Sequence, residues 1–453
     1  MTRPSATKKK DTPTKPDGIT KISVAGFKSI VEEQSIEVRP LTILAGANSS
    51  GKSSIMQPLL LLKQTLEASY DPGALRLDGP NVRFTSAEQF LSYTGRNKHT
   101  DTFFIGIGLE DASGLTIFFQ KRPSKPIEVQ KIIAEVNENG RVELKANMSS
   151  DELEAEHSDL KSIVHLLYPY AEDELFVIRD RFSLVIAVME GEDKESRQPL
   201  VVDSYGGVVE RHIREAIHLP GLRGNPERTY VVAAVGKTFP GTFENYAASI
   251  IAKWEAENDF DSLEAVSQDL KELGLTWKVS ATPLNDTQVE LQVARLPQVS
   301  KSKTSDMVSI ADVGFGVSQT LPVVVALREA KPGQLVYLEQ PEIHLHPRAQ
   351  TAMAKVLADA ARRGVHVVAE THSALLILGI QTLVAEGKLS PELVKLHWFE
   401  LQNGVTKVRS ADLDKSGSFG DWPEDFDDIE LEAQRRYLDA VEARVMEKKR
   451  RAS

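Results

Sequence analysis

The sequence predicts an α/β fold with a mixed or parallel core sheet, an antiparallel β lobe and an inserted α+β subdomain. Three observations predict it. The apolar strand Leu41–Ala45 leads into a glycine-bearing loop and then into an apolar helix that ends near Leu66. From residue 308 onward strand-like and helix-like segments alternate, which is typical of a parallel sheet. Between residues 100 and 145, aromatic and β-branched runs are separated by short turn sequences, which predicts antiparallel hairpins.

The composition excludes several classes of protein. The 453 residues are 41% hydrophobic and 26% charged, which is ordinary for a globular protein with a sizeable core. No stretch approaches the roughly 18–20 apolar residues of a membrane helix, and residues 1–18 lack the apolar segment of a secretory signal. The absence of cysteine excludes disulfides and thiolate metal sites, and the net charge of −11 argues against a wholly basic nucleic-acid coat. We therefore expect a cytoplasmic protein without a membrane partner.

The regions follow one another in a simple order. Residues 1–18 predict a disordered basic tail, since they are rich in Lys, Thr and Pro without periodicity. We expect the first part of the core in residues 19–125, an insertion subdomain in 126–225 and the second part of the core in 226–400. Residues 401–453 are predicted to form a small C-terminal element and a basic tail.

Helices and strands of the second core part carry clear end signals. Amphipathic helices are predicted near 243–256 and 261–273, the second capped by Gly274. A helix from Pro347 to Arg363 has proline in its first turn and glycine just beyond its end. The remaining predicted elements are the buried strands 335–338 and 365–369, a strand over 394–401 and a last helix near 427–448.

A glycine-rich loop carries the clearest chemical signal. Gly46-Ala-Asn-Ser-Ser-Gly-Lys-Ser53 matches G-x-x-x-x-G-K-[ST], in which backbone N–H groups surround a phosphate at the positive start of a helix. Lys52 is expected to reach the β- and γ-phosphates, and the Ser53 hydroxyl to ligand Mg²⁺. The predicted phosphate-binding residues are Gly46, Asn48, Ser49, Ser50, Gly51, Lys52, Ser53 and Ser54.

An acidic residue ends the buried strand in Leu335-Val-Tyr-Leu-Glu-Gln-Pro-Glu342. Nucleotide sites of α/β proteins collect their ligands at the carboxyl ends of strands, so Glu339 is predicted to hold Mg²⁺ directly or through water. The alternative for this segment is a buried strand followed by a surface turn.

Two further segments complete the pattern. In Asp312-Val-Gly-Phe-Gly-Val-Ser-Gln319, Gly314 and Gly316 leave N–H groups open at a predicted helix start with Ser318 as its N-cap. The alternative is an ordinary glycine-rich loop. His372 follows the buried strand 365–369, where it is either a γ-phosphate contact or a simple turn residue.

The order of these segments resembles that of the ABC-type P-loop NTPases, specifically the bacterial SMC/RecF/OLD-like AAA ATPases. Phe27-Lys-Ser29 and Glu339-Gln-Pro-Glu-Ile-His-Leu-His-Pro347 are typical of that group. Leu222-Arg-Gly-Asn-Pro-Glu-Arg228 and Phe419-Gly-Asp-Trp-Pro-Glu-Asp-Phe426 resemble one subfamily, which ends in a small domain of unassigned function. That subfamily is often found in anti-phage defence operons.

The resemblance implies ATP and Mg²⁺ as cofactors and a homodimer that sandwiches two ATP molecules. Lys52, Ser53 and Glu339 would act from one protomer, and Gly316 and Ser318 from the other. Larger oligomers stay open.

The resemblance also bears on two other features. Gln89 lies where a lobe-joining, Mg²⁺-contacting glutamine would be sought. OLD-type relatives append a nuclease domain, but little chain follows His372 and no Asp-x-Asp strand end is apparent, so we expect no nuclease here.

Gln340 occupies the position where a glutamate would activate the attacking water. An amide cannot accept that proton at neutral pH, although it can orient a water molecule. We therefore expect slow ATP hydrolysis, with Gln340 positioning water and Glu342 or His372 assisting. This expectation assumes an extended backbone that places Glu342 on the same side as Gln340. The alternative is that Glu342 is a surface turn residue and turnover is negligible.

These features lead to one main functional prediction and two alternatives. The main prediction is an ATP-dependent switch, sensor or scaffold that controls a separate effector such as a nuclease in phage defence. The alternatives are a RecF-like DNA-repair ATPase that binds DNA directly and a non-hydrolysing ATP-binding structural protein.

Overall fold

The computed structural model describes residues 17–93, 95, 99–136, 140–168, 174–191, 197–295 and 306–420. The predicted basic tail, apart from its last residues, and the predicted last helix with its Trp-Pro segment lie outside these ranges. Within the described ranges, no helix combines the length and the apolar character needed to cross a bilayer.

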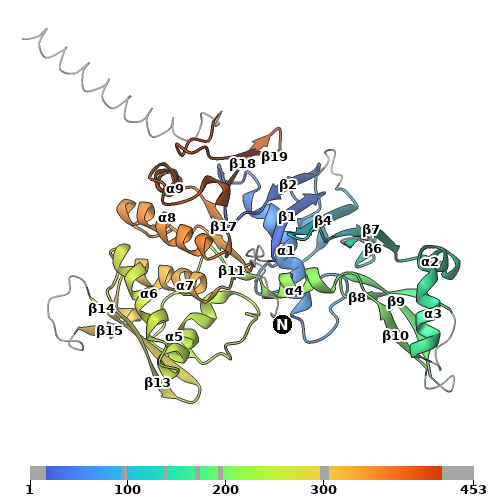
Figure 1. Cartoon of the computed structure of the whole chain (residues 1–453), viewed down its shortest axis with the longest axis horizontal. Coiled ribbons are helices and arrows are strands. Elements are labelled where there is room, and N and C mark those ends of the chain that lie inside the picture. The colour runs from blue at the N-terminus through green and yellow to red at the C-terminus, as the bar shows by residue number, and fades with distance from the viewer. Residues whose placement is uncertain are drawn as a thin grey trace, which may run out of the picture.

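A six-stranded sheet forms the centre of the molecule (Figure 1). Its strands, in spatial order, are β11 (Ile217–Leu219), β16 (Leu335–Glu339), β17 (His366–Thr371), β3 (Leu41–Gly46), β18 (Val394–Gln402) and β19 (Val405–Ala411). All neighbours are parallel except the β18–β19 hairpin. The predicted mixed core sheet is therefore present, and the carboxyl ends of its parallel strands lie along one edge.

The two faces of this sheet bury alternate residues of each strand. One face packs its Ile43, Val336 and Val367 side chains against α5 (Ala247–Ala256), α7 (Phe315–Glu329), α8 (Pro347–Arg362) and α9 (Ala374–Ala385). The other face packs Leu44 and Tyr337 against α1 (Lys52–Leu66) and the antiparallel β lobe.

The antiparallel lobe is a second six-stranded sheet. In spatial order it contains β2 (Gln34–Glu37), β1 (Ile19–Ala25), β4 (Thr102–Leu109), β5 (Gly114–Lys121), β6 (Ile127–Val136) and β7 (Gly140–Lys145). The predicted hairpins are thus confirmed. Strands β6 and β7 belong to the predicted insertion 126–225, yet they extend the sheet of the N-terminal part.

Two smaller units flank these sheets at opposite ends of the molecule (Figure 1). One contains β8 (Phe176–Asp180), β9 (Ser183–Glu190), β10 (Gln198–Asp203), α2 (Ser150–Glu156) and α3 (Ser158–Leu167). The other contains β12 (Tyr230–Val231), β13 (Val279–Asn285), β14 (Gln288–Ala294), β15 (Met307–Ser309), α5 and α6 (Phe260–Glu272). The remaining elements are α4 (Gly207–Glu215) and short 3-10 turns at Ala87–Gln89, Phe243–Tyr246, Ile310–Asp312 and Pro391–Leu393. The predicted fold class is confirmed.

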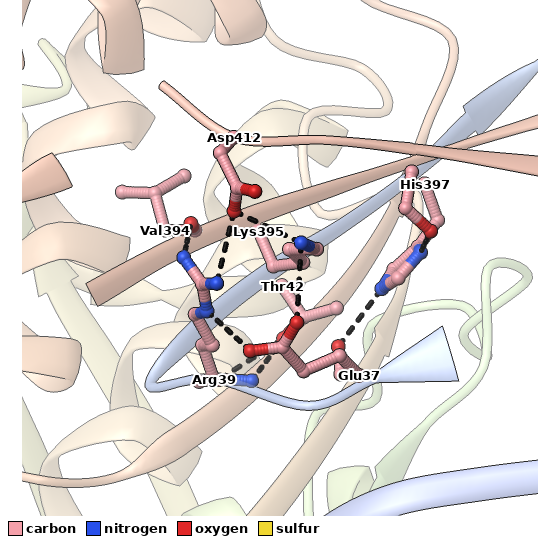
Figure 2. A network of polar contacts seen from close by, with 8 residues as sticks. Glu37, Arg39, Thr42, Val394, Lys395, His397 and Asp412 are labelled. Atoms are coloured by element: carbon pink, nitrogen blue, oxygen red, sulfur yellow. Dashed lines mark hydrogen bonds and ion pairs between the residues drawn. The ribbon is translucent and has the colours of Figure 1, made fainter. Parts of the chain in front are cut away.

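A polar network fastens the β18–β19 hairpin to the connection before β3 (Figure 2). Arg39 donates to the Val394 carbonyl at 3.1 Å and pairs with Asp412 at 2.9 Å. Lys395 pairs with Asp412 at 2.9 Å and with Glu37 at 3.1 Å. The network fixes the strand that precedes the glycine-rich loop.

Candidate functional site

The glycine-rich loop lies between β3 and α1 in an unusual backbone conformation. Gly46, Ser49 and Gly51 have φ angles of 142°, 61° and 102°. A Cβ at Gly51 would lie 2.3 Å from Oγ1 of Thr406 on β19, so this position requires glycine for both its φ angle and its packing. Positive-φ residues that alternate with ordinary ones turn backbone N–H groups toward one concavity, which suits an anion.

The side chain of Lys52 folds back over this loop. Its Nζ atom donates to the carbonyl oxygens of Gly46 at 3.0 Å and Ala47 at 2.8 Å. Burial lowers the pKa of Lys52, and the nearby Glu370 opposes that change. The Lys52 ammonium group is therefore held above the concavity by two carbonyl oxygens, and an anion there could compete for it.

A pocket of about 510 Å³ opens at the loop. Its volume falls within the range of about 300–1,000 Å³ that is usual for small-molecule sites. The lining residues are Lys28, Ser29, Asn48, Ser49, Ser50, Gly51, Lys52, Ser53, Ser54, Gln57, Gln340, Glu370 and His372. The pocket thus brings together most of the predicted phosphate-binding residues with Gln340 and His372, while Lys28, Ser29, Gln57 and Glu370 were not predicted as site residues.

Glu370 is the most informative of the missed residues. It lies on β17, next to β3, and its carboxylate oxygens are 2.9 and 2.8 Å from the Ser53 hydroxyl. The Tyr337 hydroxyl donates to the same carboxylate at 3.0 Å. Burial raises the pKa of Glu370, as does the charge of Glu339, although Ser53, Lys52 and Tyr337 oppose the rise. Its position at the carboxyl end of a predicted buried strand was the available signal.

Glu339 lies opposite Glu370 in the register of β16 and β17, but its carboxylate has different partners. One oxygen is 3.1 Å from Nε2 of His218 and the other accepts the backbone N–H of Gly221 at 3.1 Å. Burial acts to raise the pKa of Glu339, but the bonds from His218 and Gly221 and the charge of Arg223 leave it lowered. Glu339 is not among the pocket-lining residues.

The chain does not continue in an extended form after Glu339. Gln340 has a φ of 47°, and its N–H donates to the Glu370 carbonyl at 2.8 Å. The Ile343 N–H then closes a turn onto the Gln340 carbonyl at 3.1 Å. The assumption that places Glu342 beside Gln340 is therefore wrong, because a left-handed residue reverses the chain between them.

Glu342 instead points into the protein. It is 6% exposed, and its carboxylate accepts the Thr371 hydroxyl at 2.5 Å and the His372 N–H at 3.4 Å. Burial raises its pKa. The half-buried His372 does line the pocket, and burial together with the Lys52 charge lowers its pKa. Glu342 therefore reaches the pocket only through the backbone of His372.

The glycine-serine segment 312–319, called the signature segment from here on, lies outside this pocket. Helix α7 begins at Phe315 with Gly314 as its N-cap, and no side chain caps its first turn. Ser318 lies inside the helix and donates to the Phe315 carbonyl at 3.1 Å, so its predicted N-cap role is wrong. Gly316 also lies apart from the pocket. The four N–H groups at the start of α7 therefore have no side-chain acceptor.

Gln89 also lies outside the pocket. Its exposed amide accepts the Thr85 N–H at 2.8 Å and donates to the Thr85 hydroxyl at 2.8 Å. The pocket instead contains Gln57, whose buried Oε1 atom has no hydrogen-bond partner.

The pocket chemistry fits a nucleoside triphosphate with Mg²⁺. The buried hydroxyl of Ser50, like Oε1 of Gln57, has no hydrogen-bond partner, as expected for groups that await a ligand. Among the described residues no group of three His, Asp or Glu side chains could hold a metal ion. Mg²⁺ in nucleotide sites, however, needs only one or two carboxylates beside phosphate oxygens and water, and Ser53 with Glu370 supplies such a set.

Two family models match segments of the chain that contribute residues to the pocket. Residues 18–196 match the family described as "AAA ATPase domain". Residues 271–378 match the family described as "AAA domain, putative AbiEii toxin, Type IV TA system". Among curated proteins, no sequence matches this chain.

Solved structures give a more distant likeness. An SMC head bound to the C-terminal winged-helix domain of ScpA is 14% identical, with 88% of this chain and 99% of that chain covered and a TM-score of 0.47. An SMC head from Pyrococcus furiosus bound to the C-terminal domain of ScpA is 13% identical, with 94% and 100% covered and a TM-score of 0.45.

The loop with Lys52 lies in the first matched family segment, and Glu339, Glu370 and His372 lie in the second. Two segments of the chain therefore match AAA ATPase family models, and the pocket is built from both segments.

Proposed function

We propose that this chain binds ATP with Mg²⁺ in the pocket at the glycine-rich loop and hydrolyses it slowly. The observation that carries the proposal is the arrangement of Lys52, held over the loop by two carbonyl groups, beside the Ser53–Glu370 pair. Bound Mg²⁺ would neutralise phosphate charge, while Lys52 and the loop N–H groups would hold the β- and γ-phosphates.

The slow rate follows from Gln340. This residue lines the pocket, and its backbone is fixed by the Glu370 carbonyl, so its amide can orient a water molecule but cannot take its proton. His372 lies in the same pocket, where a lowered pKa favours the neutral imidazole. Glu342 acts as a positioning residue, because it holds the backbone N–H of His372.

The signature segment supports an ATP-dependent homodimer. Gly314 and Phe315 are exposed, and the start of α7 lies outside the pocket of its own chain. Gly316 and Ser318 of one protomer would face the phosphates bound by the other, so that the closed dimer forms only when ATP is present. Slow hydrolysis suits a switch whose closed state must persist.

The role of that switch is to control a separate effector, such as a nuclease, in phage defence. The second matched family supports this setting, because its description names a toxin–antitoxin system. Turnover that depends on the product of a neighbouring gene would support this role. Turnover stimulated by duplex DNA, with salt-dependent binding, would instead favour a RecF-like repair ATPase.

Calorimetric titration with ATP and Mg²⁺ tests the binding site. Lys52→Ala is expected to weaken ATP binding by at least about 100-fold, because the phosphates lose their principal cation. Lys21→Ala, which removes an exposed lysine on β1, is the matched control. Equal ATP affinity in both variants would refute the proposed site.

Steady-state ATP hydrolysis tests the roles of Gln340 and Glu342. Gln340→Glu is expected to raise turnover by about 10-fold, since a carboxylate can accept the proton. Glu342→Gln is expected to lower turnover by a few-fold through the position of His372. If both variants match the unmodified chain, neither residue has its proposed role.

A further inference from the structure

We propose that Glu370, rather than Glu339, is the carboxylate that orients the loop serine toward Mg²⁺. The proposal deepens the proposed function and rests on ATP and Mg²⁺ binding in the pocket. Both acids lie at the carboxyl ends of buried strands of the core sheet, but the sequence pattern pointed only to Glu339.

The contact with Ser53 is the first argument. A serine hydroxyl has one hydrogen and two lone pairs, whereas an ionised carboxylate only accepts hydrogen bonds. Ser53 is therefore the donor to Glu370, and both of its lone pairs stay available for a cation. Partners that orient a metal ligand in this way are a regular part of metal sites.

The order of the strands is the second argument. β17 pairs directly with β3, whereas β16 is separated from β3 by β17. With strands about 4.8 Å apart, the backbone of Glu339 lies about 10 Å from β3, roughly twice as far as that of Glu370. Glu370 lines the pocket and Glu339 does not.

The partners of each acid are the third argument. Glu339 is held on the far side of β16, by His218 of β11 and by the backbone N–H of Gly221. Glu370 contacts Ser53 of the loop and is also bonded by the fully buried Tyr337 of β16, whose ring stacks on His218 at 5.4 Å between centroids. The connected side chains of His218 and Tyr337 thus orient the Glu339 carboxylate toward β11, while the Glu370 carboxylate meets Ser53.

A matched pair of isosteric variants tests the proposal. In Glu370→Gln and Glu339→Gln, Mn²⁺ binding to the complex with a non-hydrolysable ATP analogue is measured by electron paramagnetic resonance. We expect Glu370→Gln to weaken Mn²⁺ binding by at least about 10-fold and Glu339→Gln by less than about 3-fold, since only the first removes a charge beside Ser53. Nucleotide affinity in EDTA is expected to change by less than about 3-fold in both.

Two further variants keep the test informative if Glu370→Gln is unstable. Tyr337→Phe removes one hydrogen bond to Glu370 and is expected to weaken Mn²⁺ binding by about 2–5-fold. Ser53→Ala combined with Glu370→Gln is expected to lose less than the sum of the two single changes, because the residues act as one unit. Melting temperatures of all variants report whether folding is preserved.

The outcomes separate this proposal from the proposed function. If the unmodified chain binds no nucleotide, ATP binding itself is refuted. If it binds ATP and Mn²⁺, but Glu339→Gln weakens Mn²⁺ binding as much as Glu370→Gln or more, only the role of Glu370 is overturned.

Discussion

The site has a loop side, residues 46–54, and a signature side, residues 312–319. The two sides differ in the hydrogen bonds that their polar groups make to other parts of the chain. On the loop side, Lys52, Ser53 and the Ser50 carbonyl all have partners from β3, β17 or β19 within the chain. On the signature side, the start of α7 is exposed, and Ser318 bonds only to its own helix. The difference teaches that the loop half of the pocket is held by contacts within one chain, whereas the start of α7 has no side-chain cap and, in the proposed dimer, would face the other protomer.

The largest expected effect is a loss of ATP affinity caused by a substitution in the glycine-rich loop. Gly51→Ala places a Cβ at a φ of 102° and 2.3 Å from Oγ1 of Thr406, so the loop must shift. We expect ATP affinity, measured by calorimetry, to fall by at least about 100-fold as the N–H groups lose their convergence. Gly207→Ala, a site in open space without a positive φ, is the control. Unchanged ATP affinity in Gly51→Ala would contradict a preformed cradle.

The second prediction concerns a residue that ties helix α7 to the core sheet. Arg223 is 4% exposed and donates to the Gln319 carbonyl of α7 at 3.2 Å and the Glu339 carbonyl of β16 at 3.0 Å. Arg223→Ala leaves both buried carbonyls without these donors, so we expect the free energy of unfolding in urea to fall by about 3 kcal/mol.

Arg223→Lys provides the comparison for that loss. A lysine keeps the charge but lacks the planar fork that serves two acceptors, so we expect an intermediate destabilisation of about 1–2 kcal/mol. Equal stability of all three proteins would mean that these two hydrogen bonds of Arg223 do not stabilise the packing of α7 on the sheet.

The third prediction concerns the signature side alone. Gly314 has ordinary backbone angles and open space around it, so Gly314→Asp should be tolerated as an N-cap. Its negative charge would repel a phosphate from the partner chain. We expect the ATP-dependent dimer, measured by analytical ultracentrifugation, to weaken by about 10-fold, while ATP affinity of the monomer changes less than about 2-fold.

A neutral N-cap residue at position 314 is the control that distinguishes an effect of charge from an effect of side-chain size. Gly314→Ser adds a capping hydroxyl without charge and should dimerise like the unmodified chain. Loss of monomer ATP affinity in Gly314→Asp would place the helix start in its own pocket and contradict the comparison.

The smallest expected effect concerns the network behind the loop strand. His397 bonds to the Glu37 carbonyl and the Ser410 hydroxyl, and burial lowers its pKa to about 4 (Figure 2). The unfolded chain binds a proton near the ordinary histidine pKa of about 6.5, so stability is full above that pH and is lost as the pH falls toward about 4.

Urea unfolding at two pH values measures this contribution. Between about pH 7.5 and about pH 5.5 the unmodified chain should lose about 1 kcal/mol more stability than His397→Gln, which has no proton to gain. The difference between the two proteins removes the contributions of other groups, including the buried His366. Identical pH profiles would show that His397 is not the source.

The sequence predicted the parts of the site that are contiguous in the chain. The glycine-rich loop is such a part, because eight neighbouring residues supply the φ angles, the N–H groups and the lysine. The strand that ends at Glu339, the strand before His372 and the helix from Pro347 are equally local, and each lies within one or two residues of its predicted bounds.

Other features could not be predicted from the sequence, because they depend on which strands become neighbours. The pairing of β17 with β3 brings Glu370 to Ser53 across 317 residues of sequence, and β11 brings His218 to Glu339 across 121. The left-handed Gln340 turned Glu342 inward, although a glutamine favours an extended or helical backbone.

The sequence by itself thus determined the glycine-rich loop and the fold class, because both depend on local backbone conformation and hydrophobic periodicity. Only the tertiary structure decided which acid meets the loop serine and which residues stay outside the pocket. Those choices depend on sheet order and on competition among buried polar groups for partners, and neither is encoded in any one segment of the chain.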